Sequence, residues 1–191
     1  YMRSHAYGNS VSDDLWRAID APGGAPLTEI AHQFTLRAGV PLITVRNLGC
    51  QHGSQTLVLS QTRFASDESG KQGPQLWQVP VKVRALDGSA EHKLVVAGSK
   101  PHSLAVSGCA PMLINAGQEG YFRSRYGGEM QTALAPDFGS LAIDDQLGML
   151  NDSAALSYSG TESLSKYLAL ASRVAADADP LVWNSISTNL L

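Results

Sequence analysis

Asn115-Ala116-Gly117-Gln118-Glu119-Gly120-Tyr121-Phe122-Arg123-Ser124-Arg125-Tyr126 is the stretch at which a β-patterned part of the chain gives way to a helical part. Its last residues alternate, so they predict a strand with Arg123 and Arg125 on one face. Two arginines placed in this way could bind a peptide carboxylate or an acidic partner. They could also tie carboxylates and helix ends together at a domain junction, which is the use we expect here.

Upstream of this stretch the chain has the periodicity of β-structure. From Trp77 to Ala85, apolar residues alternate with polar ones and with Pro80, and a proline inside a strand is typical of a sheet edge or a bulge. Trp77 is expected to face the core. Further strands are predicted at 40–47, 55–64, 92–97, 103–107, 111–115 and 120–126. Seven short strands separated by turn signals predict a central seven-stranded antiparallel β-sandwich, with a flexible polar connection at 67–74.

Helical patterns flank this β-block on both sides, so the expected fold class is mixed: α, then β, then α. The first helical part ends at Gly39 and Pro41, residues that stop a helix. In the last part, Asp179-Pro180 predicts a helix start with an Asp N-cap and a Pro at the first helical position. We therefore expect three domains, at 1–38, 39–127 and 128–191.

Composition and charge restrict the classes of function. The 191 residues include 43% hydrophobic residues, which is enough to bury a core. The net charge is −3 and Lys and Arg never form a run, so nucleic acid is not expected as a partner. No apolar run approaches the roughly 20 residues of a membrane span, and no signal peptide is recognisable. Both ends fall inside helical patterns, so we expect a segment of a longer protein.

The chain shows no pattern of a self-sufficient active site. It contains five histidines: His5, His32, His52, His92 and His102. None belongs to a His-Glu-x-x-His pair, and two cysteines cannot build a Cys-x-x-Cys zinc site. The acidic pairs Asp13-Asp14 and Asp144-Asp145 are interpreted as helix caps, because carboxylates are favoured at a helix N-terminus. We therefore assign no catalytic, cofactor-binding or metal-ligating residue.

Cys50 and Cys109 each lie in a turn-like context near the end of a predicted strand. One interpretation is two free cysteines that act as small hydrophobic residues. The other is a disulfide between two loops at one end of the β-block, which implies an oxidising compartment. The sequence by itself leaves both open.

Six motifs resemble, in order and spacing, those of M1-family zinc aminopeptidases of the alanyl and puromycin-sensitive type. Gln61-Thr62-Arg63-Phe64 resembles that family's Gln-x-Arg-Phe strand, and residues 115–123 resemble its Asn-x-x-x-x-Gly-Tyr-Tyr-Arg signature. The other four motifs lie at 12–19, 38–45, 76–81 and 150–156. Departures are small: Phe34 stands where Trp is usual, Arg37 replaces a Gln, and Phe122 replaces the second Tyr.

The resemblance implies a role for each expected domain. Residues 1–38 would be the last helices of a catalytic domain, 39–127 a β-sandwich linking domain, and 128–191 the start of a helical, solenoid-like C-terminal domain. The zinc ligands and catalytic residues of the parent would lie upstream of Tyr1. This segment would then be a non-catalytic spacer, and its partners would be the other domains of an enzyme that removes N-terminal amino acids from peptides.

Related bacterial members of that family often carry a cysteine pair at positions like those of Cys50 and Cys109. The resemblance therefore favours the disulfide and, with it, a periplasmic or secreted location; without the disulfide a cytoplasmic location is expected. Two alternatives to the spacer remain. An independent protein- or carbohydrate-binding β-sandwich module would expose aromatic residues on a sheet face, and an assembly element would dimerise through exposed apolar surface.

Overall fold

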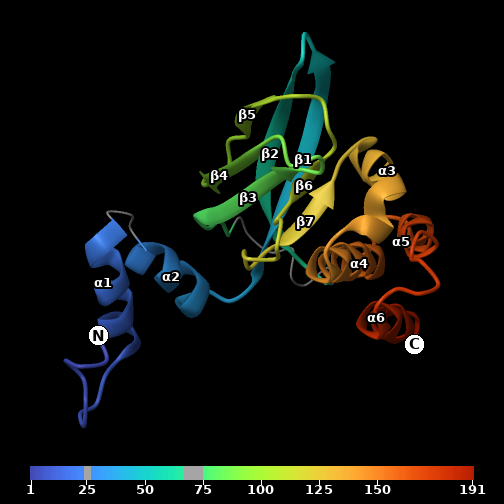
Figure 1. Ribbon diagram of the computed structural model, residues 1–191. Coiled ribbons are helices and arrows are strands. Elements are labelled where there is room, and N and C mark those ends of the chain that lie inside the picture. Colours follow the sequence, from blue (N-terminus) through green and yellow to red (C-terminus); the bar gives the residue numbers. More distant parts are fainter. Residues whose placement is uncertain (24–26, 67–74) are drawn as a thin grey trace. The chain divides into compact units, whose positions relative to one another are not determined.

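The computed structural model describes residues 1–23, 27–66 and 75–191, which divide into two units, Tyr1–Ala38 and Gly39–Leu191 (Figure 1). The connection expected at 67–74 lies outside the described residues. Within the described ranges, no helix combines the length and the apolar character that a membrane crossing requires. The division into three domains stays a prediction, because the second unit contains both the β-block and the helices that follow it.

The first unit is a pair of helices held by polar contacts. Its helices are α1 (Ser12–Gly23) and α2 (Leu27–Leu36). The carboxylate of Asp20 accepts hydrogen bonds from the backbone N–H groups of Leu27, at 2.6 Å, and Thr28, at 3.1 Å. It thereby satisfies donors that the first turn of α2 leaves without an intrahelical partner. His32 of α2 adds a contact to Asp13 of α1, with Nε2 and Oδ1 2.7 Å apart.

The second unit begins with strands that form two small sheets. The strands are β1 (Val40–Gln51), β2 (Ser54–Phe64), β3 (Val79–Ala85), β4 (Glu91–Val96), β5 (His102–Ser107), β6 (Met112–Ile114) and β7 (Arg123–Tyr126). One sheet has four strands in the order β5-β2-β1-β7, and the other has three in the order β4-β3-β6. All pairings are antiparallel except that of β7 with β1, which is parallel.

The predicted seven-stranded antiparallel β-sandwich is therefore wrong. The described residues form a mixed four-stranded sheet, an antiparallel three-stranded sheet and six α-helices. After β6 the chain leaves the three-stranded sheet, crosses through residues 115–122 and enters the other sheet beside β1, running in the same direction as β1. Alternating apolar and polar residues look the same in parallel and antiparallel strands, so the sequence pattern locates strands without revealing this direction.

The core of this unit lies on the buried faces of the two sheets, and Gln61 links them. Trp77 is only 1% exposed, which confirms that it faces the core. The Gln61 side chain is also buried: its Nε2 donates to the carbonyl oxygens of Trp77, at 2.8 Å, and Val96, at 3.2 Å. Its Oε1 accepts from the Trp77 backbone N–H at 2.6 Å. A buried amide is tolerated here because these bonds satisfy it.

Pro80 lies in β3, the central strand of the three-stranded sheet, and not in an edge strand. β4 pairs with β3 along its length, at Pro80 through Val95, but β6 pairs only with residues 83–85. Around Pro80 the strand therefore has a partner on one side only. A proline, which has no N–H to donate, is acceptable at such a position.

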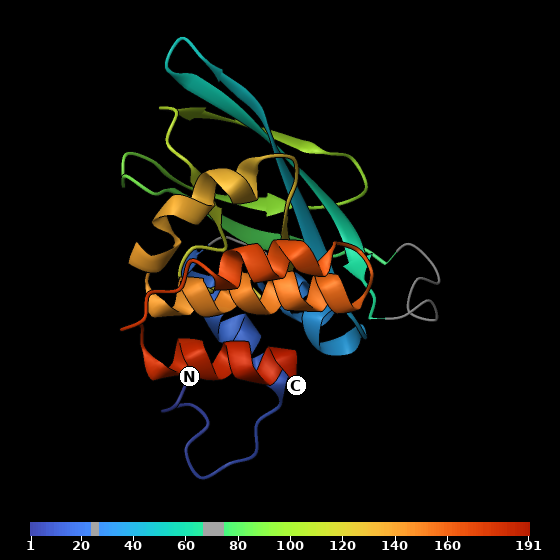
Figure 2. The ribbon, with the colours of Figure 1, turned by 90° about the vertical axis from the view of Figure 1, so that its right-hand side faces the viewer.

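Helices follow the β-block. They are α3 (Met130–Leu134), the 3₁₀ helix η2 (Ala135–Ser140), α4 (Ile143–Tyr158), α5 (Leu164–Ala171) and α6 (Pro180–Leu190). The predicted start at Asp179-Pro180 is confirmed, since the Asp179 side chain accepts from the Leu181 N–H at 2.8 Å. Figure 2 shows α4 running alongside both α5 and α6. α4 also contacts β7, and α3 contacts β6, so both helices connect the helical part to the sheets.

Candidate functional site

The stretch 115–126 forms a junction with α4, and a tight loop at 115–120 begins it. Asn115 has a φ of +58° and directly follows β6. Its side chain spans the loop: Oδ1 accepts from the Gly120 N–H at 2.8 Å, and Nδ2 donates to the Gly120 carbonyl at 3.0 Å. Asn is among the few residues that tolerate a positive φ and bond to their own backbone neighbours. The loop is therefore closed by a single side chain.

Asp145, in the first turn of α4, fastens this loop from outside. It is fully buried, and its Oδ1 accepts from the Gly117 backbone N–H at 2.7 Å. Its Oδ2 accepts from the Arg84 guanidinium of β3 at 2.9 Å. A buried carboxylate is stable only when it is paired and hydrogen-bonded, and Asp145 has both kinds of partner. Asp144 and Asp145 do lie in the first turn of α4, as the interpretation expects, but the Asp145 side chain bonds to Gly117 and Arg84 and does not cap its own helix.

Asp152 repeats the arrangement two turns further along α4. One carboxylate oxygen accepts from the Ser124 backbone N–H of β7 at 2.7 Å, and the other from the Arg123 guanidinium at 3.1 Å. The Arg123 guanidinium also lies over the Phe64 ring, 5.6 Å from its centre. Burial raises the pKa of Asp152 to about 6, and the hydrogen bond from Ser124 and the charge of Arg123 oppose this rise.

The spacing along α4 brings both carboxylates to the same side of the helix. Asp145, Gly148 and Asp152 stand at positions i, i+3 and i+7, which share one face of an α-helix. Gly148 provides room between them, because a Cβ at this position would overlap the end of the Gln118 side chain. The face of α4 that meets the loop and β7 therefore carries two acidic side chains, and the Gln118 side chain lies against Gly148 between them.

Arg125 of β7 completes the junction through Glu162, a residue that follows the end of α4. Its Nε donates to Glu162 Oε1 at 3.1 Å, and Lys166 of α5 donates to the same oxygen at 2.9 Å. The Glu162 side chain is 3% exposed. Arg123 and Arg125 thus contact carboxylates of the helical part, the structural use expected for them. Tyr126 adds a bond between the sheets: its hydroxyl accepts from the Ile114 N–H at 3.0 Å, and burial raises its pKa.

These contacts fasten elements together, and they do not assemble reactive groups. In the described parts of the chain, no group of three or more His, Cys, Asp or Glu side chains is placed to hold a metal ion. The acidic pair of the first unit engages Arg17, since Asp14 Oδ1 lies 3.0 Å from Nη2 of that residue. His102 bonds to the backbone of Ala97. The described residues therefore offer no site that fits a zinc ion.

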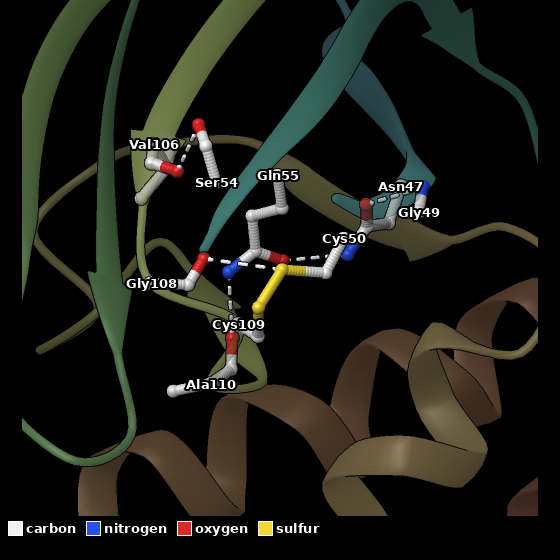
Figure 3. The surroundings of a disulfide bond; sticks show 9 residues. All are labelled: Asn47, Gly49, Cys50, Ser54, Gln55, Val106, Gly108, Cys109 and Ala110. Carbon is white, nitrogen blue, oxygen red and sulfur yellow. Dashed lines mark hydrogen bonds between the residues drawn. A yellow bond between two sulfur atoms is a disulfide. The ribbon is translucent and has the colours of Figure 1, made fainter. Parts of the chain in front are cut away.

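The structure joins Cys50 and Cys109 in a disulfide, with their Cα atoms 5.5 Å apart (Figure 3). The bond connects the end of β1 to the segment between β5 and β6, and both residues are exposed. Beneath it, the buried Gln55 side chain donates to the Ala110 carbonyl at 2.8 Å and accepts from Asn47 Nδ2 at 2.6 Å. The same two segments are therefore held by a covalent bond and by a buried amide.

The sequence pattern does not indicate the residues that matter most at the junction. It predicts a place at a helix start for Asp145, and it points to no junction role for Asp152 or Glu162. No single position carries a strong signal. Asp145 pairs with Arg84 of β3, whereas Asp152 pairs with Arg123 of β7. The partners come from different strands, so no regular spacing in the sequence indicates these contacts.

Comparisons with known proteins agree with this geometry. The family described as ERAP1-like C-terminal domain matches residues 111–191, which include the junction stretch and all helices after it. A puromycin-sensitive aminopeptidase of Caenorhabditis elegans is 29% identical over 100% of this chain and 21% of its own length. Aminopeptidase M1 of Arabidopsis thaliana is 30% identical over 97% of this chain and 22% of its own length.

A third relative, the alanine/arginine aminopeptidase of Saccharomyces cerevisiae, is 26% identical over 100% of this chain and 22% of its own length. The chain thus spans about a fifth of the length of the curated relatives it matches. The similarity runs through both units and through the junction. On these matches, the chain belongs to the M1 family of aminopeptidases.

Proposed function

We propose that this chain is a non-catalytic segment of an M1-type aminopeptidase, in which the two sheets form a rigid spacer that carries the helical C-terminal part. The parent enzyme would release N-terminal amino acids from peptides with a bound zinc ion held by residues outside this chain. The observation that carries this proposal is the pair of buried carboxylates, Asp145 and Asp152, which bind α4 to the sheets.

The physical argument is one of geometry. A spacer transmits position only if its parts do not slide, and each carboxylate here accepts one hydrogen bond from a backbone N–H and one from an arginine. Backbone donors cannot change rotamer, so these bonds set the register of α4 against the loop and against β7. Breaking either pair leaves a buried charge without a partner, which is costly. The contacts therefore suit a segment that holds the helical part in a fixed position against the sheets.

Enzymatic assay of the 191-residue chain tests the proposal. Highly purified chain is expected to release no product from aminoacyl-arylamides and to bind no stoichiometric zinc, measured by elemental analysis after dialysis against the metal. Hydrolysis that co-purifies with the chain and is abolished by a chelator would overturn it. A full-length relative assayed in parallel is the positive control for the substrate and the metal.

An exported parent is the second part of the proposal, and it rests on Cys50 and Cys109. Disulfides persist in oxidising compartments and are rare in the cytosol. Alkylation of the natural protein before any reduction is expected to leave both cysteines unmodified in the mass spectrum. Two alkylated cysteines in freshly lysed cells would place the protein in a reducing compartment instead.

The alternative of an independent carbohydrate- or protein-binding module loses its main support. It called for exposed aromatic side chains on a sheet face, and Trp77, the large aromatic residue next to β3, is buried. The strongly exposed Tyr121 lies in the loop segment before β7 and outside every strand.

A further inference from the structure

A cavity of about 350 Å³ lies beside the outer half of β1, on the side where α3 begins. Its walls are residues 46–49 of β1, residues 111–112 at the start of β6, and residues 127–130 with Ala133 of α3. Met112 and Met130 are buried at the cavity, whereas Leu48 is 66% exposed. The volume falls in the range of pockets that hold ligands, and flexible methionines adapt to apolar groups of different shapes.

Along this cavity, no strand in the part of the chain that the structure describes pairs with the edge of β1. β7 pairs with residues 42–45 of β1, and the Val45 carbonyl accepts a last bond from the Gly127 N–H at 2.8 Å. Beyond Val45, no strand within the described ranges pairs with this edge, while β2 pairs with the opposite edge as far as Gln51. Backbone groups point to alternate edges from one residue to the next, so Asn47 directs its N–H and C=O the same way as Val45.

The charges at the cavity select the kind of ligand. Arg46 and Glu129 both line it, and neither forms an ion pair with any residue that the structure describes. Because one is positive and the other negative, the rim has no net charge that would attract a polyanion. A neutral ligand with backbone-type donors and acceptors and an apolar side chain fits these groups.

The unpaired part of the β1 edge, beyond Val45, is also short. A bulge interrupts the pairing of β1 between Asn47 and Cys50, and the Gly49 N–H donates to Asn47 Oδ1 at 2.9 Å. Bulges of this kind discourage sheet-to-sheet association of whole edges. A few residues of extended chain are therefore a better match than a second copy of this sheet.

We propose that this groove binds a short extended segment of another polypeptide, which adds as a strand to β1 at Asn47. One apolar side chain of that segment enters the cavity against Leu48, Met112 and Met130. Strand addition at an exposed sheet edge obtains its affinity from main-chain hydrogen bonds and its selectivity from such side-chain pockets. This proposal is independent of the spacer function proposed above.

The disulfide sets the width of the groove. Gly49 directly precedes Cys50 in one wall, and Pro111 follows Cys109 by two residues in another wall. The Cys50–Cys109 bond therefore fixes the spacing of the two walls. Reduction of the bond is expected to weaken binding of the segment, because the hydrogen bonds of Gln55 then hold the two walls together without the covalent bond.

An NMR titration of the ¹⁵N-labelled 191-residue chain tests the proposal. The probe is the blocked peptide acetyl-Thr-Val-Thr-Val-Thr-amide, and the control peptide is identical except that its valines are N-methylated and cannot donate. The probe is expected to shift the amide signals of Asn47, Leu48, Gly128 and Ala133, and the methylated peptide is not. No saturable shifts, shifts elsewhere, or equal binding of both peptides would overturn the proposal.

Two substitutions locate the site. Leu48→Asp is expected to weaken the probe about tenfold or more, since it replaces an apolar contact by a charge. Val95→Asp is the matched control: it changes an exposed apolar residue in the edge strand β4, and the affinity is expected to stay the same. If Leu48→Asp perturbs the fold, Ala133→Glu, on the α3 wall, replaces it. Equal losses for a groove variant and for Val95→Asp would count against the groove.

A second copy of the chain is the competing occupant. Sedimentation at increasing protein concentration distinguishes it, because self-association through this edge would produce a dimer that Leu48→Asp abolishes. Such a dimer would overturn the proposal, whereas a monomer that binds the probe supports it.

Discussion

The disulfide region and the α4 junction both fasten segments that are distant in the sequence, but by opposite means. At the first, two exposed cysteines close a loop with a sequence separation of 59 residues. At the second, two buried carboxylates of α4 each meet one arginine and one backbone N–H. The disulfide holds its two segments together although it is exposed to solvent. The buried carboxylates stabilise the junction only while each of them keeps both of its hydrogen-bond donors.

This difference determines how each region fails. A disulfide stabilises mainly by restricting the unfolded chain, so its loss removes a constraint and leaves no unsatisfied group behind. Removal of one buried carboxylate does the reverse, because the remaining arginine and N–H lose their acceptor inside the protein. The junction should therefore be the more sensitive of the two to a single substitution.

Replacement of Asp145 by Ala has the largest expected effect. It deprives Arg84 and the Gly117 N–H of their acceptor, and we expect a loss of about 3 kcal/mol or more in the free energy of unfolding. Urea unfolding followed by circular dichroism measures it. Asp144→Ala is the matched control: the neighbouring residue is exposed, and its loss is expected to stay below about 1 kcal/mol. Similar losses for both variants would contradict the role given to Asp145.

Loss of the disulfide ranks next. The double variant Cys50→Ser, Cys109→Ser is expected to lose about 2–4 kcal/mol of unfolding free energy, the typical contribution of a native disulfide. The wild-type chain in reductant should unfold at the same urea concentration as this variant, and reductant should not affect the variant itself. A wild-type chain that is indifferent to reductant would show that the bond does not restrain the fold.

The sequence by itself leaves the pairing of Cys50 and Cys109 open, but it reduces the choice to two free cysteines or one disulfide, and the family resemblance favours the disulfide. The ionic contacts of α4 have no comparable pattern in the sequence, and the reason is physical. Asp145 and Asp152 are common residues on a helix, and their role arises only once α4 lies against β7. Strand positions followed from side-chain alternation, for instance from Trp77 to Ala85. The parallel entry of β7 beside β1 did not, because it depends on where the loop at 115–120 sends the chain.

The pH dependence of stability tests the second carboxylate. Burial raises the pKa of Asp152 to about 6 from an ordinary value of 3.8. Because the folded state holds this proton more tightly than the unfolded state, the resulting stabilisation is full below pH 3.8 and is lost as the pH rises to about 6. At about 1.4 kcal/mol per pKa unit the full loss should be about 3 kcal/mol, of which about 2 kcal/mol falls between pH 4 and pH 7. Asp152→Asn removes this group, so its stability relative to wild type should improve by that amount between pH 4 and pH 7, measured by urea unfolding. A constant difference would show that Asp152 keeps an ordinary pKa.

The smallest expected effect is the difference in stability between two glycine-to-alanine substitutions at the junction, one beside a fixed side chain and one beside a mobile side chain. A Cβ on Gly120 would overlap the buried Phe122 ring and lie 3.0 Å from Asn115 Oδ1, and neither group is free to withdraw. Gly120→Ala should therefore lose about 1 kcal/mol or slightly more. A Cβ on Gly148 would overlap only the end of the Gln118 side chain, which is able to swing aside. Alanine is also the better helix former by about 1 kcal/mol, so Gly148→Ala should be close to neutral. Thermal unfolding of the two variants measures both effects. A larger loss of stability for Gly148→Ala than for Gly120→Ala would contradict this expectation. It would mean that the contact of Gln118 with α4, and not the loop at 115–120, fixes the position of α4.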